Sequence, residues 1–150
     1  MNLQIDDIAP DFSGEDQFGN TYRLNSFSGW RTVVIAFYPY DWSPICSLQM
    51  TEIQRDLDLY KNAGALIIAI SADSAYSHKS WAEKHGFKFP LISDYDRMIA
   101  SAYGVLNEKG FAERTVFIVG KDARIKYIRS CKTSERPSNE SLLKILHELK

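Results

Sequence analysis

The chain has 150 residues, of which 45% are hydrophobic and 25% are charged, and its formal net charge is −1. These values are typical of a globular protein large enough to bury a core, so we expect one domain over residues 1–150. The near-zero net charge argues against nucleic acid or an anionic membrane as a partner, and no apolar run approaches the ~20 residues that a membrane helix needs.

Apolar runs and turn residues predict strands that alternate with helices, followed by a hairpin and a last helix. The N-terminal hairpin turns at Gly19-Asn20. Strands are expected at the return of that hairpin, residues 22–24, and then at 32–37, 65–70, 89–92, 114–119 and 123–128. Helices are expected at 43–62, 75–85, 96–103 and from Ser138 onward, and a glycine follows each of the first three within two residues.

This order of elements is that of an α/β protein with a thioredoxin-like fold. Helices should cover both faces of a mixed central sheet, and a β-hairpin should extend the N-terminus. Strand 32–37 is apolar without polar alternation and should lie at the centre. If strand 114–119 runs antiparallel to it, Arg114 enters the sheet at the edge where the central strand ends. The following hairpin returns Cys131 to that edge, so both residues should converge on Cys46.

The segment after the central strand has the chemistry of a helix start. Ser43 suits the N-cap and Pro44 the first helical position, so Cys46 should be the third helical residue. A thiol there lies at the positive end of the helix dipole and is easier to ionise. Two cysteines are too few for a disulfide scaffold, and the first seven residues lack the features of a signal peptide, so we expect a cytoplasmic protein. We therefore interpret Cys46 as reactive rather than as an inert buried thiol.

The pattern Pro39-x-x-x-Ser43-x-x-Cys46 matches the Pro-x-x-x-Thr/Ser-x-x-Cys signature of peroxiredoxins, and Arg114 matches their distant active-site arginine. Gln49 lies where that family usually carries Glu, Gln or His. The resemblance covers nearly the whole chain. It implies a thiol peroxidase that reduces hydrogen peroxide or organic hydroperoxides without a cofactor or metal. It also implies a thiol reductant such as thioredoxin, and the family commonly forms homodimers.

Residues 77–82 and 89–94 resemble the branch called bacterioferritin comigratory proteins, or its one-cysteine relatives. That branch often has a resolving cysteine five residues after the peroxidatic one, where this chain has Thr51. A sulfenic acid on Cys46 must therefore be resolved by Cys131, by a partner chain or by an external thiol. Cys131 is the candidate resolving residue, with a plain core or loop thiol as the alternative. A disulfide needs Cα atoms within ~7 Å, so one end would have to unwind.

Ionisation of the sulfur supplies only a modest part of peroxide reduction, because a more acidic thiol is also a weaker nucleophile. The larger part must come from donors aimed at the charge that develops on the peroxide oxygens. Arg114 offers a permanent cation, and Ser43 offers a hydroxyl between sulfur and peroxide. Pro39 would shield the sulfur from water, and Gln49 would brace the helix or an interface.

Simpler interpretations apply to several residues. Arg114 could be a solvated residue that flanks an apolar strand. The three histidines, His78, His85 and His147, are expected at the surface without metal-ligand clustering. Residues 40–42 should be exposed and could join subunits. For the whole chain, the alternatives are dithiol–disulfide exchange, which lacks a Cys-x-x-Cys pair, a Cys-His hydrolase, and a non-catalytic thioredoxin-like module that senses oxidants or binds a partner.

Overall fold

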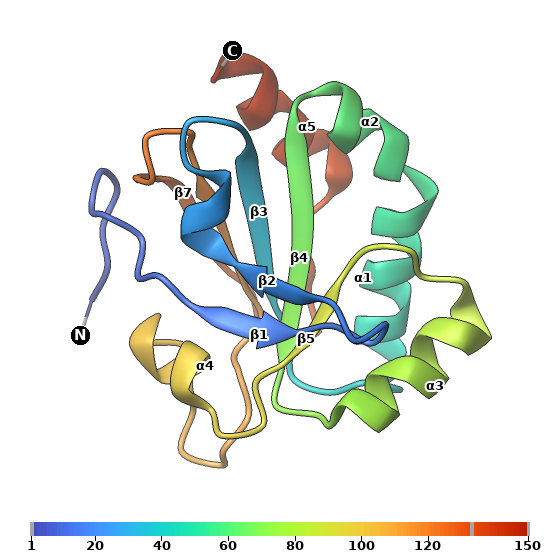
Figure 1. Ribbon diagram of the computed structural model, residues 1–150. Helices are drawn as coiled ribbons and strands as arrows, with labels where there is room; N and C mark the ends of the chain where they lie inside the picture. Colours follow the sequence, from blue (N-terminus) through green and yellow to red (C-terminus); the bar gives the residue numbers. More distant parts are fainter. Residues whose placement is uncertain (1, 133, 150) are drawn as a thin grey trace.

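A five-stranded mixed sheet forms the centre of the protein, whose computed structural model describes residues 2–132 and 134–149. The strands lie in the order β5-β4-β3-β6-β7 (Figure 1). Their bounds are Thr32–Phe37 for β3, Ala65–Ser71 for β4, Leu91–Ser93 for β5, Thr115–Val119 for β6 and Ile125–Ser130 for β7. β4 pairs parallel with β3 and β5, whereas β6 runs antiparallel to β3 and β7. The predicted mixed sheet, with β3 at its centre, is confirmed.

A β-hairpin extends the N-terminus, as expected from the Gly19-Asn20 turn. β1 (Ser13–Glu15) pairs antiparallel with β2 (Thr21–Arg23), and Gly19 between them has a φ of 82°. β1 packs against β5 in the central sheet. Gly14 permits this approach, because a Cβ there would collide with the side chain of Ile92.

The four predicted helices occur in the predicted order, but the first of them is split in two, and a 3-10 helix that was not predicted precedes it. Their bounds are Leu24–Phe27 for the 3-10 helix η1, Pro44–Arg55 for α1, Leu57–Asn62 for α2, Ala75–His85 for α3, Met98–Ala102 for α4 and Asn139–Glu148 for α5. The helix predicted over 43–62 is split at Asp56, which has a φ of −105°. Nδ2 of Asn139 donates to the carbonyl oxygen of Glu52 at 2.8 Å and to the Asp56 carboxylate at 2.9 Å. A contact from far along the chain therefore fixes this break.

Several other boundaries differ from the prediction by one or two residues. β5 begins at Leu91 rather than at 89, and α4 begins at Met98 rather than at 96. The carboxylate of Asp94 accepts the backbone N–H groups of Ile99 and Ala100 at 3.0 and 2.8 Å, so it determines where α4 starts. β7 starts at 125 rather than at 123, because Ala123 lies in the preceding turn with a φ of 65°.

The sheet separates two hydrophobic cores, and helices cover both of its faces, as predicted (Figure 1). One core joins the sheet to α1, α3 and α5 and includes Met50, Trp81 and Leu142. The other lies beneath the hairpin and α4 and includes Phe12 and Ile99. Within the described ranges, no helix combines the length and the apolar character needed to cross a membrane.

Candidate active site

The N-terminus of α1 holds Cys46 at the carboxyl end of β3. Ser43 is the N-cap, and its Oγ accepts a hydrogen bond from the backbone N–H of Cys46 at 3.1 Å. Pro44 is the first residue of the helix, so Cys46 is the third, as predicted. The side chain of Cys46 is fully buried, whereas Ser43 is partly exposed. The helix start therefore places a hydroxyl and a backbone donor beside a sheltered sulfur.

Arg114 brings a cation to this sulfur from the segment that enters β6. Its Nη2 donates to Sγ of Cys46 at 3.4 Å, and its Nη1 donates to Oε1 of Gln49 at 2.6 Å. Gln49 is buried and lies three residues after Cys46 on α1, so one helix supplies both acceptors. The side chain of Arg114 is buried with 2% exposure. The interpretation of Arg114 as a solvated flanking residue is therefore wrong.

The burial of Arg114 has an electrostatic consequence for its neighbour. Removing a guanidinium from water is costly unless acceptors or negative charge surround it. The Cys46 sulfur and the Gln49 amide oxygen supply two acceptors here. A cation held against sulfur away from bulk water stabilises negative charge on that sulfur, and also on an oxygen bound beside it. The arrangement can therefore support attack by an anionic sulfur on a polar bond.

Cys131 lies at the same edge of the sheet, as the topology predicted. Its backbone N–H donates to the carbonyl oxygen of Arg114 at 2.8 Å, one step beyond the paired residues Thr115 and Ser130. Residues directly opposite one another in an antiparallel ladder share a face of the sheet. Cys131 is partly exposed, and both cysteines are free thiols. The structure thus brings Cys131 next to the backbone of Arg114.

The loop between β3 and α1 turns some side chains inward and others outward. Pro39 is buried, as a residue that shields the sulfur should be. Tyr40 and Trp42 are 47% and 48% exposed, which agrees with the prediction for this loop. Asp41 between them is only 5% exposed, so the prediction that all of 40–42 faces solvent is wrong.

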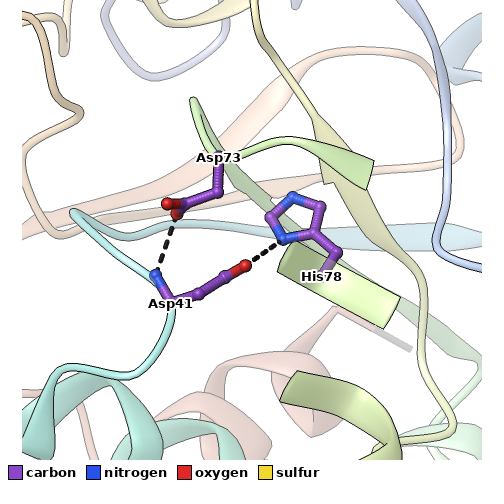
Figure 2. Close-up of side chains that lie close together, drawn as sticks. All are labelled: Asp41, Asp73 and His78. Atoms are coloured by element: carbon purple, nitrogen blue, oxygen red, sulfur yellow. Dashed lines mark hydrogen bonds and ion pairs between the residues drawn. The ribbon is translucent and has the colours of Figure 1, made fainter. Parts of the chain in front are cut away.

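Asp41 is buried because it joins a polar cluster with Asp73 and His78 (Figure 2). Oδ2 of Asp41 lies 2.7 Å from Nδ1 of His78, and the backbone N–H of Asp41 donates to Oδ2 of Asp73 at 2.8 Å. The Tyr38 hydroxyl donates to Oδ1 of Asp41 at 2.7 Å, and Oγ of Ser77 donates to Oδ2 at 2.9 Å. Burial raises the pKa of Tyr38 well above its ordinary value, and the nearby Asp41 carboxylate raises it further. Tyr38 therefore stays protonated and able to donate.

His78 corrects the prediction that all three histidines are surface residues. It is fully buried, and its Nε2 lies 3.1 Å from the carbonyl oxygen of Ile92, whereas His85 and His147 are exposed as predicted. His78 stands three residues before Trp81 on α3, and both point into the protein. That helical spacing from a large apolar residue is a signal that could have identified His78 as buried.

Asp41, Asp73 and His78 offer ligand atoms within 4.8 Å of one another, a spacing that could hold a metal ion. Both oxygens of Asp41 already receive hydrogen bonds, and the Nδ1–Oδ2 separation of 2.7 Å is that of a hydrogen bond to His78. Oδ2 of Asp73 likewise accepts from the Ser71 hydroxyl at 2.6 Å and from the Asp41 backbone. This chemistry is that of a hydrogen-bonded network rather than of a metal centre.

Comparison with known proteins adds an independent line of evidence. The pattern of the AhpC/TSA family matches residues 5–128. A peroxiredoxin of Escherichia coli (strain K12) named Bcp is 34% identical over 133 residues, which cover 84% of this chain and 85% of that protein. Alkyl hydroperoxide reductase E of Mycobacterium bovis is 33% identical over 128 residues, which cover 83% of this chain and 84% of the relative.

A solved structure shows the same fold. Peroxidoxin BcpB of Mycobacterium tuberculosis superimposes with a TM-score of 0.88 at 23% identity, and the match covers 99% of each chain. The resemblance that residues 39–46 and Arg114 indicated thus extends to the whole arrangement of strands and helices.

Proposed function

The chain belongs to the AhpC/TSA family of peroxiredoxins and is a thiol-dependent peroxidase, and we propose that Cys46 is its peroxidatic residue. The predicted resemblance to bacterioferritin comigratory proteins is confirmed by the 34% identity to Bcp. The observation that supports the assignment of Cys46 is its contact with Arg114, 3.4 Å from Nη2 to Sγ. Arg114, Ser43 and Pro39 complete the proposed site.

The proposed reaction is a displacement at oxygen. The Cys46 thiolate attacks one oxygen of a hydroperoxide, an S–O bond forms and the O–O bond breaks. The sulfur is oxidised to a sulfenic acid, and the second oxygen takes up a proton and leaves as water or an alcohol. Negative charge moves from sulfur to oxygen during this step, so fixed donors beside both atoms stabilise the transition state.

Each neighbouring residue has a distinct part in this step. The guanidinium of Arg114 is a cation that offers several N–H donors to the sulfur and the peroxide. The backbone N–H of Cys46 donates to the Ser43 hydroxyl oxygen at the helix start, which leaves the hydroxyl proton for a peroxide oxygen to accept. Pro39 donates nothing and keeps water from the sulfur. Gln49 positions Arg114 through the bond at 2.6 Å.

Recycling requires a thiol, and we propose a reductant such as thioredoxin or another small dithiol system, with Cys131 as the candidate resolving residue. Support for Cys131 comes from its place opposite Arg114 at the edge of the sheet that holds Cys46. Cys46 is 0% exposed, so the first turn of α1 must move before a second thiol can reach it. A homodimer and a cytoplasmic location complete the proposal, together with a single domain over residues 1–150.

The test is a single-turnover reaction of the reduced protein with one equivalent of hydrogen peroxide or an organic hydroperoxide. Peroxide should be consumed with the formation of one oxygen adduct on Cys46, and Cys46→Ser should abolish consumption while Cys131→Ser retains it. Non-reducing mass spectrometry then distinguishes a Cys46–Cys131 disulfide from a lone sulfenic acid. A rate no faster than that of a free thiol would instead support a non-catalytic redox-sensing or partner-binding module.

A further inference from the structure

The loop between β3 and α1 encloses the sulfur that the proposed function requires to react twice. Cys46 is 0% exposed in this conformation. A thiol carried by a protein cannot reach a sulfur that has no exposed surface, whereas hydrogen peroxide, little larger than water, needs only a small displacement of the loop. The loop must therefore open for recycling and close again for the next peroxide. The contacts that hold the loop closed therefore determine how often it opens. The need for opening rests on the proposed function.

The backbone of the loop does not favour the closed shape by itself. Trp42 has a φ of 71°, in the left-handed region that a bulky side chain adopts only at a cost. Its ring is about half exposed, and its aromatic face lies 5.9 Å from Nζ of Lys84, a distant cation–π contact. Neither feature accounts for the closed conformation of the loop. The contacts that stabilise it must come from other residues.

Asp41, immediately before Trp42, is tied to three separate parts of the chain. Its carboxylate accepts from Tyr38 at the end of β3, and from Ser77 and His78 on α3, at 2.7 to 2.9 Å. Its backbone N–H donates to Asp73 in the loop after β4 at 2.8 Å. The side chains of Asp41 and His78 are both 0% exposed. In this conformation protein donors replace the hydration shell of the carboxylate, and Figure 2 shows the contact with His78.

We propose that Asp41 is a positioning residue that latches the Cys46 loop closed through the donors of Tyr38, Ser77 and His78. The latch acts on the equilibrium between a closed form, which reduces peroxide, and an open form, in which Cys46 meets a thiol. Removing one hydrogen bond to a charged group shifts such an equilibrium about 10- to 100-fold. If the closed form predominates, its population hardly changes. The population of the open form rises about 10- to 100-fold.

Tyr38→Phe removes one donor to Asp41 while keeping the buried ring. Tyr60→Phe is the matched control, because Tyr60 is also fully buried in the same core and its hydroxyl donates to Oδ1 of Asn139 at 2.7 Å, away from the loop. Ser77→Ala removes a second donor from a partly exposed position on α3. It leaves intact the backbone N–H of Ser77, which donates to the N-cap residue Ser74.

The experiment measures how fast a bulky maleimide alkylates Cys46 in the reduced full-length protein, with Cys131→Ser present throughout so that only one thiol reacts. We expect Tyr38→Phe and Ser77→Ala to raise the labelling rate about tenfold or more, and Tyr60→Phe to leave it unchanged. Reduction of the Cys46 sulfenic acid by thioredoxin should rise in the same two variants. Melting temperatures measured alongside separate local opening from global destabilisation, since Tyr60→Phe also loses a buried hydrogen bond.

Equal labelling rates in Tyr38→Phe, Ser77→Ala and Tyr60→Phe would overturn the latch. It would also be overturned if the labelling rate rose in all three variants in proportion to the fall in their melting temperatures. If Tyr38→Phe does not fold, Ser77→Ala alone decides between these outcomes. Labelling requires no peroxide, so the result stands even if the protein with native Tyr38 and Ser77 consumes peroxide no faster than a free thiol. That second outcome would reject the proposed function and not the latch.

Discussion

Replacement of Arg114 by Met tests whether the guanidinium drives the reaction at Cys46. Met is close to Arg in length and has no charge, so it fills the buried space that Arg114 occupies and leaves no large cavity. The variant loses the donor at 3.4 Å from the sulfur and the partner of Gln49 Oε1 at 2.6 Å. Arg114→Lys keeps the charge but replaces the planar fork, which contacts two acceptors at once, by a single ammonium group.

The size of the effect follows from the distance. Two unit charges separated by 3.4 Å attract by about 5 kcal/mol at an effective dielectric constant of about 20. Only the part of this attraction that grows in the transition state affects the rate, because the charge on sulfur is present before the reaction. Loss of one preorganised donor to a developing oxyanion slows other enzymes by about 10²–10³, or about 3–4 kcal/mol. We therefore expect Arg114→Met to slow Cys46 oxidation by about 10²–10³, and Arg114→Lys to recover about tenfold of that loss.

The assay is stopped-flow fluorescence of the reduced protein mixed with excess hydrogen peroxide, and the second-order rate constant is compared among variants. Arg124→Ala is the control, since Arg124 is an exposed arginine at the other end of β6 and β7 whose Nη1 donates to the carbonyl oxygen of Asp6 at 2.8 Å. Circular dichroism shows whether each variant is folded. A folded Arg114→Met that reacts within about threefold of the native rate would refute transition-state stabilisation by Arg114.

Three further outcomes follow from the site and its supports. Ser43→Ala should lower the free energy of unfolding by about 1 kcal/mol through loss of the N-cap, and it should slow the oxidation of Cys46 by peroxide about tenfold. Ser43→Thr should retain the native stability and rate. Chemical denaturation measures the free energy of unfolding, and stopped-flow measures the rate. Cys131→Ser should oxidise at the native rate but accumulate sulfenic acid on Cys46, as mass spectrometry would show. The hydrogen bonds from Arg136 hold the pKa of Glu52 below its ordinary value of 4.5, so their stabilisation is present above that pH and is lost as the pH falls through the lowered value. Arg136→Ala should therefore cost about 0.5–1 kcal/mol near neutral pH, and the difference from the native protein should vanish in acid titrations of stability.

Local chemistry explains why the helix start was predictable. Ser43 and Pro44 act through their own backbone and the next three residues, so their roles can be assigned without knowledge of any distant contact. The arrival of Arg114 at Cys46 required only one further assumption, that β6 runs antiparallel to β3, which the register bears out.

Contacts between distant segments explain what was missed. Asn139 breaks the helix at Asp56, and Asp94 determines where α4 begins, because each offers polar atoms to a backbone that local propensity alone would continue differently. Gln49 was assigned a bracing role, but its partner could not be identified, since 65 residues separate it from Arg114. His78 was missed for another reason. Histidine is polar by type, and its buried polar partners, Asp41 and the carbonyl oxygen of Ile92, make the position of His78 favourable.

Arg114 contacts the Cys46 sulfur and Asp41 lies buried in the loop that leads to it, and the buried charge of Asp41 affects how easily the loop opens. A loop sealed by apolar packing would expose hydrophobic surface on opening and gain nothing from water in return. In the proposed open form the buried carboxylate of Asp41 instead recovers its hydration, which offsets much of the lost protein contact. Charged groups therefore make closure specific in geometry and still reversible. The proposed reaction of Cys46 with a small peroxide and then with a large thiol needs both properties, and apolar residues at positions 41 and 78 would supply neither.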